Sequence, residues 1–190
     1  MEGTRDRVVA TAGRLFREQG YHATGLNQVL AESNAPKGSL YFHFPGGKEQ
    51  LAADALARSG AELGERMAAA LAATDDPATG LATLAELFAA ELRASDFRRG
   101  CPVATVALEA AAGSDPIRTT CDGVYSAWLA GLTERLRSWG VSAERAEPLA
   151  TLTLSTLQGA LLLARTRRDA DLVSDVAAQL GALLTAEVTR

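Results

Sequence analysis

Side chains able to bind a polyanion gather between residues 20 and 51. Lysine, tyrosine, histidine and threonine side chains there can donate hydrogen bonds to phosphate oxygens, and lysine can also bind the acceptor edge of a guanine. Two small residues among them would let the backbone come close to a bulky ligand. The set comprises Thr24, Lys37, Gly38, Ser39, Tyr41, His43 and Lys48. Residues of these types are able to contact nucleic acid.

Two short helices and a tight turn must position these side chains. Residues 26–33 carry an apolar face, and Thr24 is a candidate N-cap for them. Asn34 can adopt a left-handed backbone conformation, and Pro36 suits the first turn of a second helix over residues 36–43. Two short helices joined in this way are typical of a helix-turn-helix.

The string from Gly20 to Leu51 resembles the DNA-binding segment of the TetR family of repressors. The residues that carry the resemblance, each at the family's spacing, are Phe16, Gly20, Thr24, Gly38, Leu40, Tyr41, His43, Phe44, Lys48 and Leu51. The resemblance implies that helices 26–33 and 36–43 bind operator DNA, with the second in the major groove. Tyr41, His43 and Lys48 are then expected to bind phosphates, while Lys37 reaches a base edge or a phosphate. Leu40 and Phe44 should face inward.

Each of these roles has a plainer alternative. Thr24 could serve only as a helix cap, Tyr41 only as packing, and His43 as a core histidine. Lys37 could be a solvated charge, and its residue type leaves base contact and phosphate contact open. A change in sequence preference, as opposed to a uniform loss of affinity, separates the two roles of Lys37.

The remaining pattern predicts an all-α chain, because alanine and leucine dominate and runs of β-branched residues are scarce. Apolar residues three and four apart predict about nine helices. Besides the two short ones, they cover residues 4–19, 48–73, 77–94, 102–112, a helix ending at 139, 143–167 and 170–187. We expect a helix-turn-helix DNA-binding domain in residues 1–47 and a helical effector-binding and dimerisation domain in residues 48–190.

In the family that the sequence resembles, the last two long helices pair with a partner subunit. Here these are 143–167 and 170–187, and the first is apolar on nearly all sides, which an isolated solvated helix is not. Packing within one chain is the alternative. A homodimer would match a palindromic operator, because two-fold symmetry in the protein then corresponds to two-fold symmetry in the DNA.

The segment of residues 100–111 looks like the LmrA/YxaF-type branch of the family, which is associated with control of export and catabolic genes. Some members of that branch respond to flavonoid-type effectors, but no effector is transferred to this chain. Aromatic walls with a few polar tips are typical of small-molecule sites. The expected pocket residues are Phe88, Leu92, Cys101, Val106, Tyr125, Trp128 and Gln158. Ordinary core packing is the alternative for each of them.

Composition limits the class of protein. The formal net charge is −4, so the chain is not basic throughout, although residues 1–50 carry a net +1. Two cysteines, Cys101 and Cys121, are too few for a disulfide framework, and a redox role for them stays open. The start of the chain lacks an apolar leader, and the most apolar run, 149–164, is shorter than the ~20 residues of a membrane span. We expect a soluble cytoplasmic protein with no membrane contact.

Catalytic motifs are absent from the sequence. It has no glycine-rich phosphate loop, nucleophile elbow or zinc-protease motif, and its two histidines and two cysteines lack metal-ligand spacing. We therefore expect no enzyme activity, no cofactor and no metal. The sequence predicts a DNA-binding transcriptional regulator, by family default a repressor released from its operator by a small-molecule effector that changes the tilt of the helix from residue 48.

Two alternatives remain open. One is a DNA-binding dimer without a small effector, controlled by a protein partner, by thiol oxidation or by abundance. The other is an all-α enzyme or binding protein whose helix-turn-helix no longer binds DNA. The operator sequence, the regulated genes and the identity of the effector cannot be inferred from these patterns.

Overall fold

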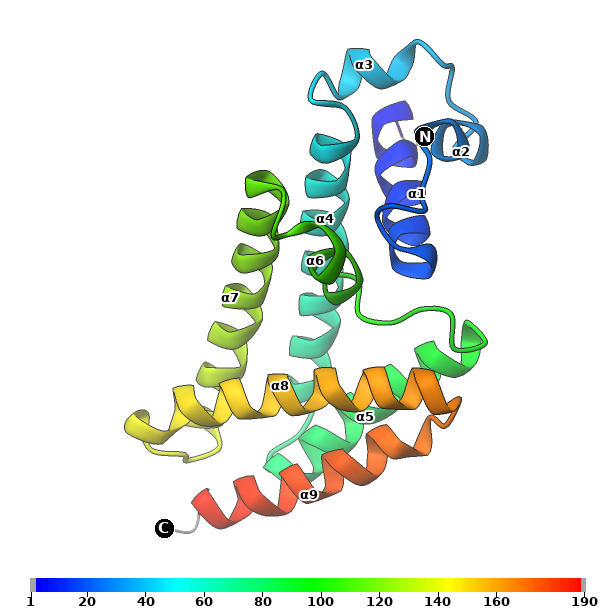
Figure 1. The fold of residues 1–190 in the computed structure, drawn as a ribbon. Helices are drawn as coiled ribbons and strands as arrows, with labels where there is room; N and C mark the ends of the chain where they lie inside the picture. Colours follow the sequence, from blue (N-terminus) through cyan, green and yellow to red (C-terminus); the bar gives the residue numbers. More distant parts are fainter. Residues whose placement is uncertain (1–2, 189–190) are drawn as a thin grey trace. The chain divides into compact units, whose positions relative to one another are not determined.

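The computed structural model describes residues 3–188 and, over that range, consists of nine helices with no strand (Figure 1). Their bounds are α1 (Thr4–Gln19), α2 (Leu26–Glu32), α3 (Ser39–His43), α4 (Gly47–Ala72), α5 (Pro77–Ala94), α6 (Ala104–Ala110), α7 (Asp115–Ser138), α8 (Ala143–Arg167) and α9 (Asp171–Val188). The predicted all-α fold class is confirmed. None of the helices in the described range is long and apolar enough to span a bilayer.

Several helix ends lie where the sequence predicted them, because the residues there tolerate unusual backbone conformations. Gly20 follows α1 with φ +88°, and Gly140 follows α7 with φ +98°. Asn34, with φ +51°, makes the turn after α2 in the left-handed region, as expected of an asparagine. These local steric preferences therefore set the ends of the helices before any tertiary contact is considered.

Two expectations about the short helices are wrong. The N-cap of α2 is Gly25 and not Thr24, whose hydroxyl bonds back to the Gly20 carbonyl. The third helix begins at Ser39, so Pro36 lies in the preceding turn, where its carbonyl accepts a 2.9 Å hydrogen bond from the Ser39 N–H. A further difference is that α6 is shorter at both ends than the predicted 102–112.

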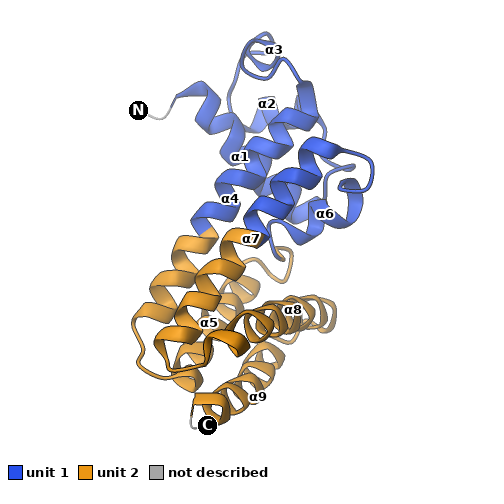
Figure 2. Cartoon of the chain, turned by 90° about the vertical axis from the view of Figure 1, so that its left-hand side faces the viewer, with its two compact units in different colours: residues 1–62, 101–125 blue, residues 63–100, 126–190 orange. Residues whose placement is uncertain are grey.

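The chain packs as two compact units, coloured separately in Figure 2. Unit 1 comprises residues 1–62 and 101–125, and unit 2 comprises residues 63–100 and 126–190. The division falls within α4 and α7 and not before residue 48. The functional division between residues 1–47 and 48–190 therefore remains a prediction.

The core of unit 1 holds the three N-terminal helices together. One side of α1 is buried from Val8 to Phe16, and α2 contributes Val29. Leu40 and Phe44 bring α3 into the same core. Burial of a leucine or phenylalanine side chain stabilises a fold by roughly 1.5–3 kcal/mol. Two such residues are enough to hold a five-residue helix that could not form alone.

In unit 2, the close approach of α5 and α9 depends on glycine. A Cβ on Gly181 would lie 2.9 Å from the backbone Cα of Ala78, which is closer than packed side chains allow. The first turn of α5 is capped by Asp76, whose carboxylate accepts a 2.9 Å hydrogen bond from the Thr79 N–H. That bond lowers the pKa of Asp76.

Candidate nucleic-acid interface

The register of α3 presents one side of the helix to solvent. Leu40 and Phe44 are four residues apart, so they share one face, and both are buried. On the remaining surface Tyr41 is 68 % exposed and Phe42 is 82 % exposed. Lys37 and Gly38, which precede the helix, are exposed as well. The inward roles predicted for Leu40 and Phe44 are confirmed.

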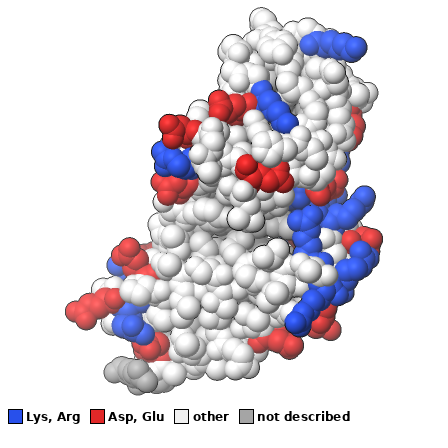
Figure 3. Space-filling model, in the orientation of Figure 1, with Lys and Arg blue, Asp and Glu red and all other residues white. Residues whose placement is uncertain are grey.

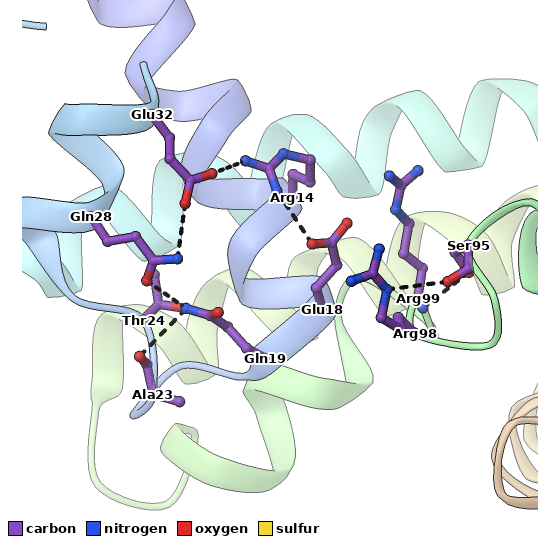
Figure 4. A network of polar contacts seen from close by, with 10 residues as sticks. All are labelled: Arg14, Glu18, Gln19, Ala23, Thr24, Gln28, Glu32, Ser95, Arg98 and Arg99. Carbon is purple, nitrogen blue, oxygen red and sulfur yellow. Dashed lines mark hydrogen bonds and ion pairs between the residues drawn. The ribbon is translucent and has the colours of Figure 1, made fainter. Parts of the chain in front are cut away.

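A polar network fixes α2 against α1 (Figure 4). Arg14 of α1 pairs with Glu32 of α2 and donates a 3.2 Å hydrogen bond to Glu18. Gln28 donates to Glu32 at 2.9 Å and accepts from the Gln19 amide at 2.8 Å. The hydrogen bonds from Gln28 and Arg14 lower the pKa of Glu32, so its carboxylate stays charged and the ion pair persists.

Three further residues drawn in Figure 4 belong to unit 2. They lie at and after the end of α5, where the Ser95 hydroxyl accepts a 3.1 Å hydrogen bond from the Arg99 N–H. Arg98 donates to the Ser95 carbonyl at 3.5 Å. These bonds close the loop after α5.

Thr24 is placed differently from the other predicted contacts. It is 1 % exposed, and its hydroxyl donates a 2.7 Å hydrogen bond to the Gly20 carbonyl while accepting one from Gln19 at 3.2 Å. A bond from this hydroxyl to a phosphate would require the bond to Gly20 to break. Its phosphate contact remains a prediction, and in the free protein Thr24 orders the turn between α1 and α2.

Lys48 lies against the same turn. Its ammonium is 4.5 Å from the centroid of the Tyr21 ring and donates a 3.5 Å hydrogen bond to the His22 carbonyl. Partial burial lowers the pKa of Lys48, and the charge of Glu109 acts in the opposite direction. Burial, followed by the charge of Glu49, raises the pKa of Tyr21, so this ring stays a neutral phenol.

Glu109 of α6 holds the α1–α2 turn from a distant part of the sequence. Its carboxylate accepts a 2.9 Å hydrogen bond from the His22 N–H, and its backbone carbonyl lies 3.2 Å from His22 Nε2. A Cβ on Gly20 would overlap the Glu109 carboxylate. No role for Glu109 was predicted from the sequence. No local signal could reveal a contact between residues 87 positions apart.

Ser39 and His43 complete the surface of α3. The Ser39 hydroxyl donates a 2.7 Å hydrogen bond to the Pro36 carbonyl, which fixes the start of the helix. His43 is half-buried, and its ring stands edge to face against Phe42, with the ring centroids 5.0 Å apart. The ring centroids of His43 and Phe44 are 6.2 Å apart.

The charge on this part of the molecule is mixed. Arg5 pairs with Asp54 at 2.8 Å, and Arg14 pairs with two glutamates, so much of the local arginine charge is balanced. Basic and acidic side chains are likewise interspersed over the face drawn in Figure 3. Unit 1 would therefore bind a polyanion through a few individual hydrogen-bond donors and not through a large positive electrostatic potential.

The residues predicted to line a pocket divide between the two units. Cys101, Val106 and Tyr125 belong to unit 1, whereas Phe88, Leu92, Trp128 and Gln158 belong to unit 2. All are buried except Tyr125 and Gln158, which are half-buried. Within unit 1, burial raises the pKa of Tyr125, and its hydrogen bond with Cys101 acts in the same direction.

The second cysteine, Cys121, belongs to the same unit. It is buried, and burial followed by the nearby Cys101 raises its pKa. Both cysteines are free thiols. The described residues contain no group of three or more histidine, cysteine, aspartate or glutamate side chains placed to hold a metal ion.

A short helix with an exposed outer side, held by two helices beneath it, defines the class of helix-turn-helix DNA-binding proteins. Comparison with known proteins narrows the class. Residues 8–55 match the model described as "Bacterial regulatory proteins, tetR family", and residues 77–179 match "Transcriptional regulator LmrA/YxaF-like, C-terminal domain".

Relatives at the level of whole chains agree. The HTH-type transcriptional regulator LmrA of Bacillus subtilis is 37 % identical, with 87 % of this chain and 88 % of that protein covered. An HTH-type transcriptional regulator of Mycobacterium tuberculosis is 39 % identical, with 99 % and 97 % covered. The crystal structure of regulatory protein TetR from Rhodobacter sphaeroides has the same fold, with a TM-score of 0.84 over 94 % of this chain and 97 % of that one, at 21 % identity.

The chain belongs to the TetR family of bacterial transcriptional regulators, and its C-terminal part is of the LmrA/YxaF-like kind. It is a DNA-binding regulator and not an enzyme, as the sequence predicted. Members of the family bind operator DNA and dimerise. The resemblance stated from residues 20–51 and 100–111 is confirmed by both matches.

Proposed function

We propose that this regulator is a repressor that binds a palindromic operator as a homodimer and leaves it when a small-molecule effector binds. The exposed side of α3 is the observation that carries the proposal. Leu40 and Phe44 pack inward, and the hydrogen-bonding residues around α3 remain on the surface. A short helix of this kind fits the major groove of B-DNA.

Roles on this surface follow from reach and residue type. Tyr41 can donate its exposed phenol hydrogen to a phosphate, and His43 and Lys48 supply further donors at the end of α3 and the start of α4. Lys37 extends from the leading end of α3 and is assigned a base edge. Gly38 and Ser39 keep that end small, which lets the helix enter the groove.

Lys37 and Tyr41 are tested as a pair. Tyr41→Phe should weaken binding to all sequences alike, since it removes one phosphate contact. Lys37→Ala should change the preferred sequence, at a cost of roughly 1–3 kcal/mol for the affected base pair. Competition titrations of both variants against single-base operator changes measure the difference. A uniform loss for Lys37→Ala would reassign Lys37 to a phosphate.

The proposed dimer interface is the outer side of α8 and α9. Residues 148–164 carry no charged side chain, and Figure 3 shows an uncharged surface over the middle of α8. Gly159 and Leu163 lie seven and eleven residues after Leu152, so these three residues share one line on the surface of α8. Leu152 and Leu163 are exposed in the single chain, as is Leu183 of α9. A partner's equivalent helices would bury this line.

The dimer proposal has a matched pair of variants. Gly159 and Gly131 both lie within helices, are exposed, and have no heavy atom of the described residues near the position of a Cβ. Gly159→Leu should dissociate the dimer because it places a bulky group on the proposed line, whereas Gly131→Leu on α7 should not. Sedimentation of both variants measures the outcome. A dimer that survives Gly159→Leu would move the interface elsewhere.

The pocket residues predicted from the sequence are retained as the proposed effector contacts. In unit 1, Val106 could line an apolar ligand site to which Cys101 and Tyr125 supply polar contacts. In unit 2, Phe88, Leu92 and Trp128 could line an apolar site to which Gln158 supplies a polar contact. Effector control requires that the ligand bind the operator-free state more tightly than the operator-bound state. Titration of candidate ligands into the operator complex tests this, and equal operator affinity with every ligand would contradict it.

Thiol oxidation is a second candidate for control, because Cys101 and Cys121 are both free thiols of unit 1. Two thiols and one hydrogen peroxide molecule would give a disulfide and two water molecules. Burial raises the pKa of Cys121, however, and so lowers the thiolate fraction that reacts. Effector control is therefore preferred. Operator binding that is lost in peroxide, and protected by Cys101→Ala, would reverse that order.

Selection of DNA from a random library, with the bound complex sized in the same preparation, tests the central proposal. Enrichment of a palindrome bound by one dimer or a pair of dimers is the expected result. The absence of any enriched sequence at low salt, where phosphate contacts are strongest, would overturn it.

A further inference from the structure

Phe42 is an aromatic side chain that lies mostly in solvent. It is 82 % exposed, whereas Phe16, Phe44 and Phe88 are buried. A single exposed apolar residue is common on protein surfaces and by itself indicates nothing. The position of Phe42 on the helix that enters DNA is what gives its exposure a meaning.

The helical register places Phe42 at the outermost point of α3. Leu40 and Phe44 define the buried face, and Phe42 is two residues from each of them. At about 100° per residue, a residue two positions from both lies opposite the middle of that face. Gly38 lies four residues earlier on the same outer side and has no side chain, so nothing on the helix screens the Phe42 ring.

The ring is also partly oriented before any ligand binds. His43 stands edge to face against it, with the ring centroids 5.0 Å apart. An aromatic ring in this position cannot bond a phosphate or a base edge. It can only make an apolar contact with whatever the groove presents to it.

We propose that Phe42 selects thymine, by packing its ring on the 5-methyl group of one thymine in each operator half-site. The proposal rests on the proposed binding of α3 in the major groove. Among the four bases only thymine presents a methyl group there, whereas the other base edges present polar donors and acceptors. Water would have to leave those polar edges without replacement if they faced Phe42.

The role proposed for Phe42 differs from the roles of its neighbours on and beside α3. Phosphate contacts by Tyr41 fix register and are independent of sequence, and Lys37 is assigned a hydrogen bond to a base edge. Loss of the Phe42 ring should therefore change the preference at one thymine and leave the salt dependence of binding unchanged, because no phosphate contact is removed.

Deoxyuridine provides the test, because it differs from thymidine only in lacking the 5-methyl group. Each thymine of the selected operator is replaced in turn by deoxyuridine, in both half-sites together, and affinity is measured for the wild type, Phe42→Ala and Phe42→Leu. Burial of one methyl group corresponds to about a fourfold change in affinity, or about 15-fold when two half-sites are changed. The wild type and Phe42→Leu should show that loss at one position, and Phe42→Ala should bind both duplexes equally.

Either of two results would overturn this inference without affecting the proposed operator binding. In the first, Phe42→Ala discriminates thymine from uracil like the wild type. In the second, Phe42→Ala loses affinity by the same factor for every duplex. A variant that changes the oligomeric mass but not the base preference would assign Phe42 to a protein contact and would also overturn it. If the wild-type protein enriches no sequence, the proposed operator binding and this inference fail together. Thermal unfolding should be unchanged in both variants, since Phe42 is exposed.

Discussion

Gly38 offers a test of which side of α3 faces DNA, because the folded protein itself has no need of a glycine there. Its backbone has φ −72° and ψ −15°, which any L-residue adopts readily. No heavy atom of the described residues, apart from its chain neighbours, lies within 4 Å of the position that a Cβ would take. Packing and backbone strain therefore do not explain the residue.

The variant Gly38→Ala should consequently leave the free protein as stable as before, or more so. Replacing glycine by alanine at a compatible position adds roughly 0.4–1 kcal/mol to the free energy of unfolding, through the lower entropy of the unfolded chain. For a chain of this size about 1 kcal/mol corresponds to an increase in Tm of about 2–4 °C.

Operator binding should respond in the opposite direction. The new methyl group would project from the outer side of α3, on the face it shares with Phe42, where the helix meets the floor of the groove. Overpacking a closely fitted contact costs about 1–3 kcal/mol. That range corresponds to operator affinity about 5- to 150-fold weaker.

Fluorescence anisotropy with an operator duplex at constant salt measures the affinity, and circular dichroism measures Tm. Gly113→Ala is the matched control, because Gly113 is also exposed, has open space around its Cβ position and lies outside the α3 region. A Gly38→Ala variant that binds the operator like the wild type would refute the assigned orientation of α3. A fall in both Tm and affinity would refute the account of its packing.

Three further outcomes are expected. Glu109→Ala should weaken operator binding in anisotropy titrations, because the His22 N–H loses its acceptor and the turn beside Lys48 loosens. Glu109→Gln keeps an acceptor, removes a negative charge and should bind at least as tightly as the wild type; an alanine variant with unchanged affinity would contradict this role. The lowered folded-state pKa of Asp76 means that its contribution to stability is present above the unfolded-state pKa and is lost as pH falls through the folded-state value. Asp76→Asn should keep the cap and flatten the fall in Tm between about pH 5 and pH 3, and an equally steep fall would exclude Asp76 as its source. Gly181→Ala should lower the free energy of unfolding by about 1–3 kcal/mol, because its Cβ meets the backbone of Ala78; an unchanged urea midpoint would show that α5 and α9 can separate without cost.

Local properties of the sequence were enough to predict most of the fold. Apolar residues three and four apart mark a helix wherever one side of it must be buried, and this period is visible in α1 without knowledge of what α1 packs against. Gly20, Asn34 and Gly140 end or turn helices because of their own backbone sterics. The inward side of α3 follows from the same period, since Leu40 and Phe44 are its only large aliphatic and aromatic residues four apart.

Tertiary structure decided what depends on partners distant in the sequence. A hydroxyl such as that of Thr24 can cap a helix, bind a ligand or bond a carbonyl, and only the position of Gly20 shows that it does the last. The bond between Glu109 and His22 joins residues 87 apart, and nothing in either segment indicates the other. Residues 101–125 join the same compact unit as residues 1–62 for the same reason, because packing between distant segments depends on shape in three dimensions and not on local residue pattern.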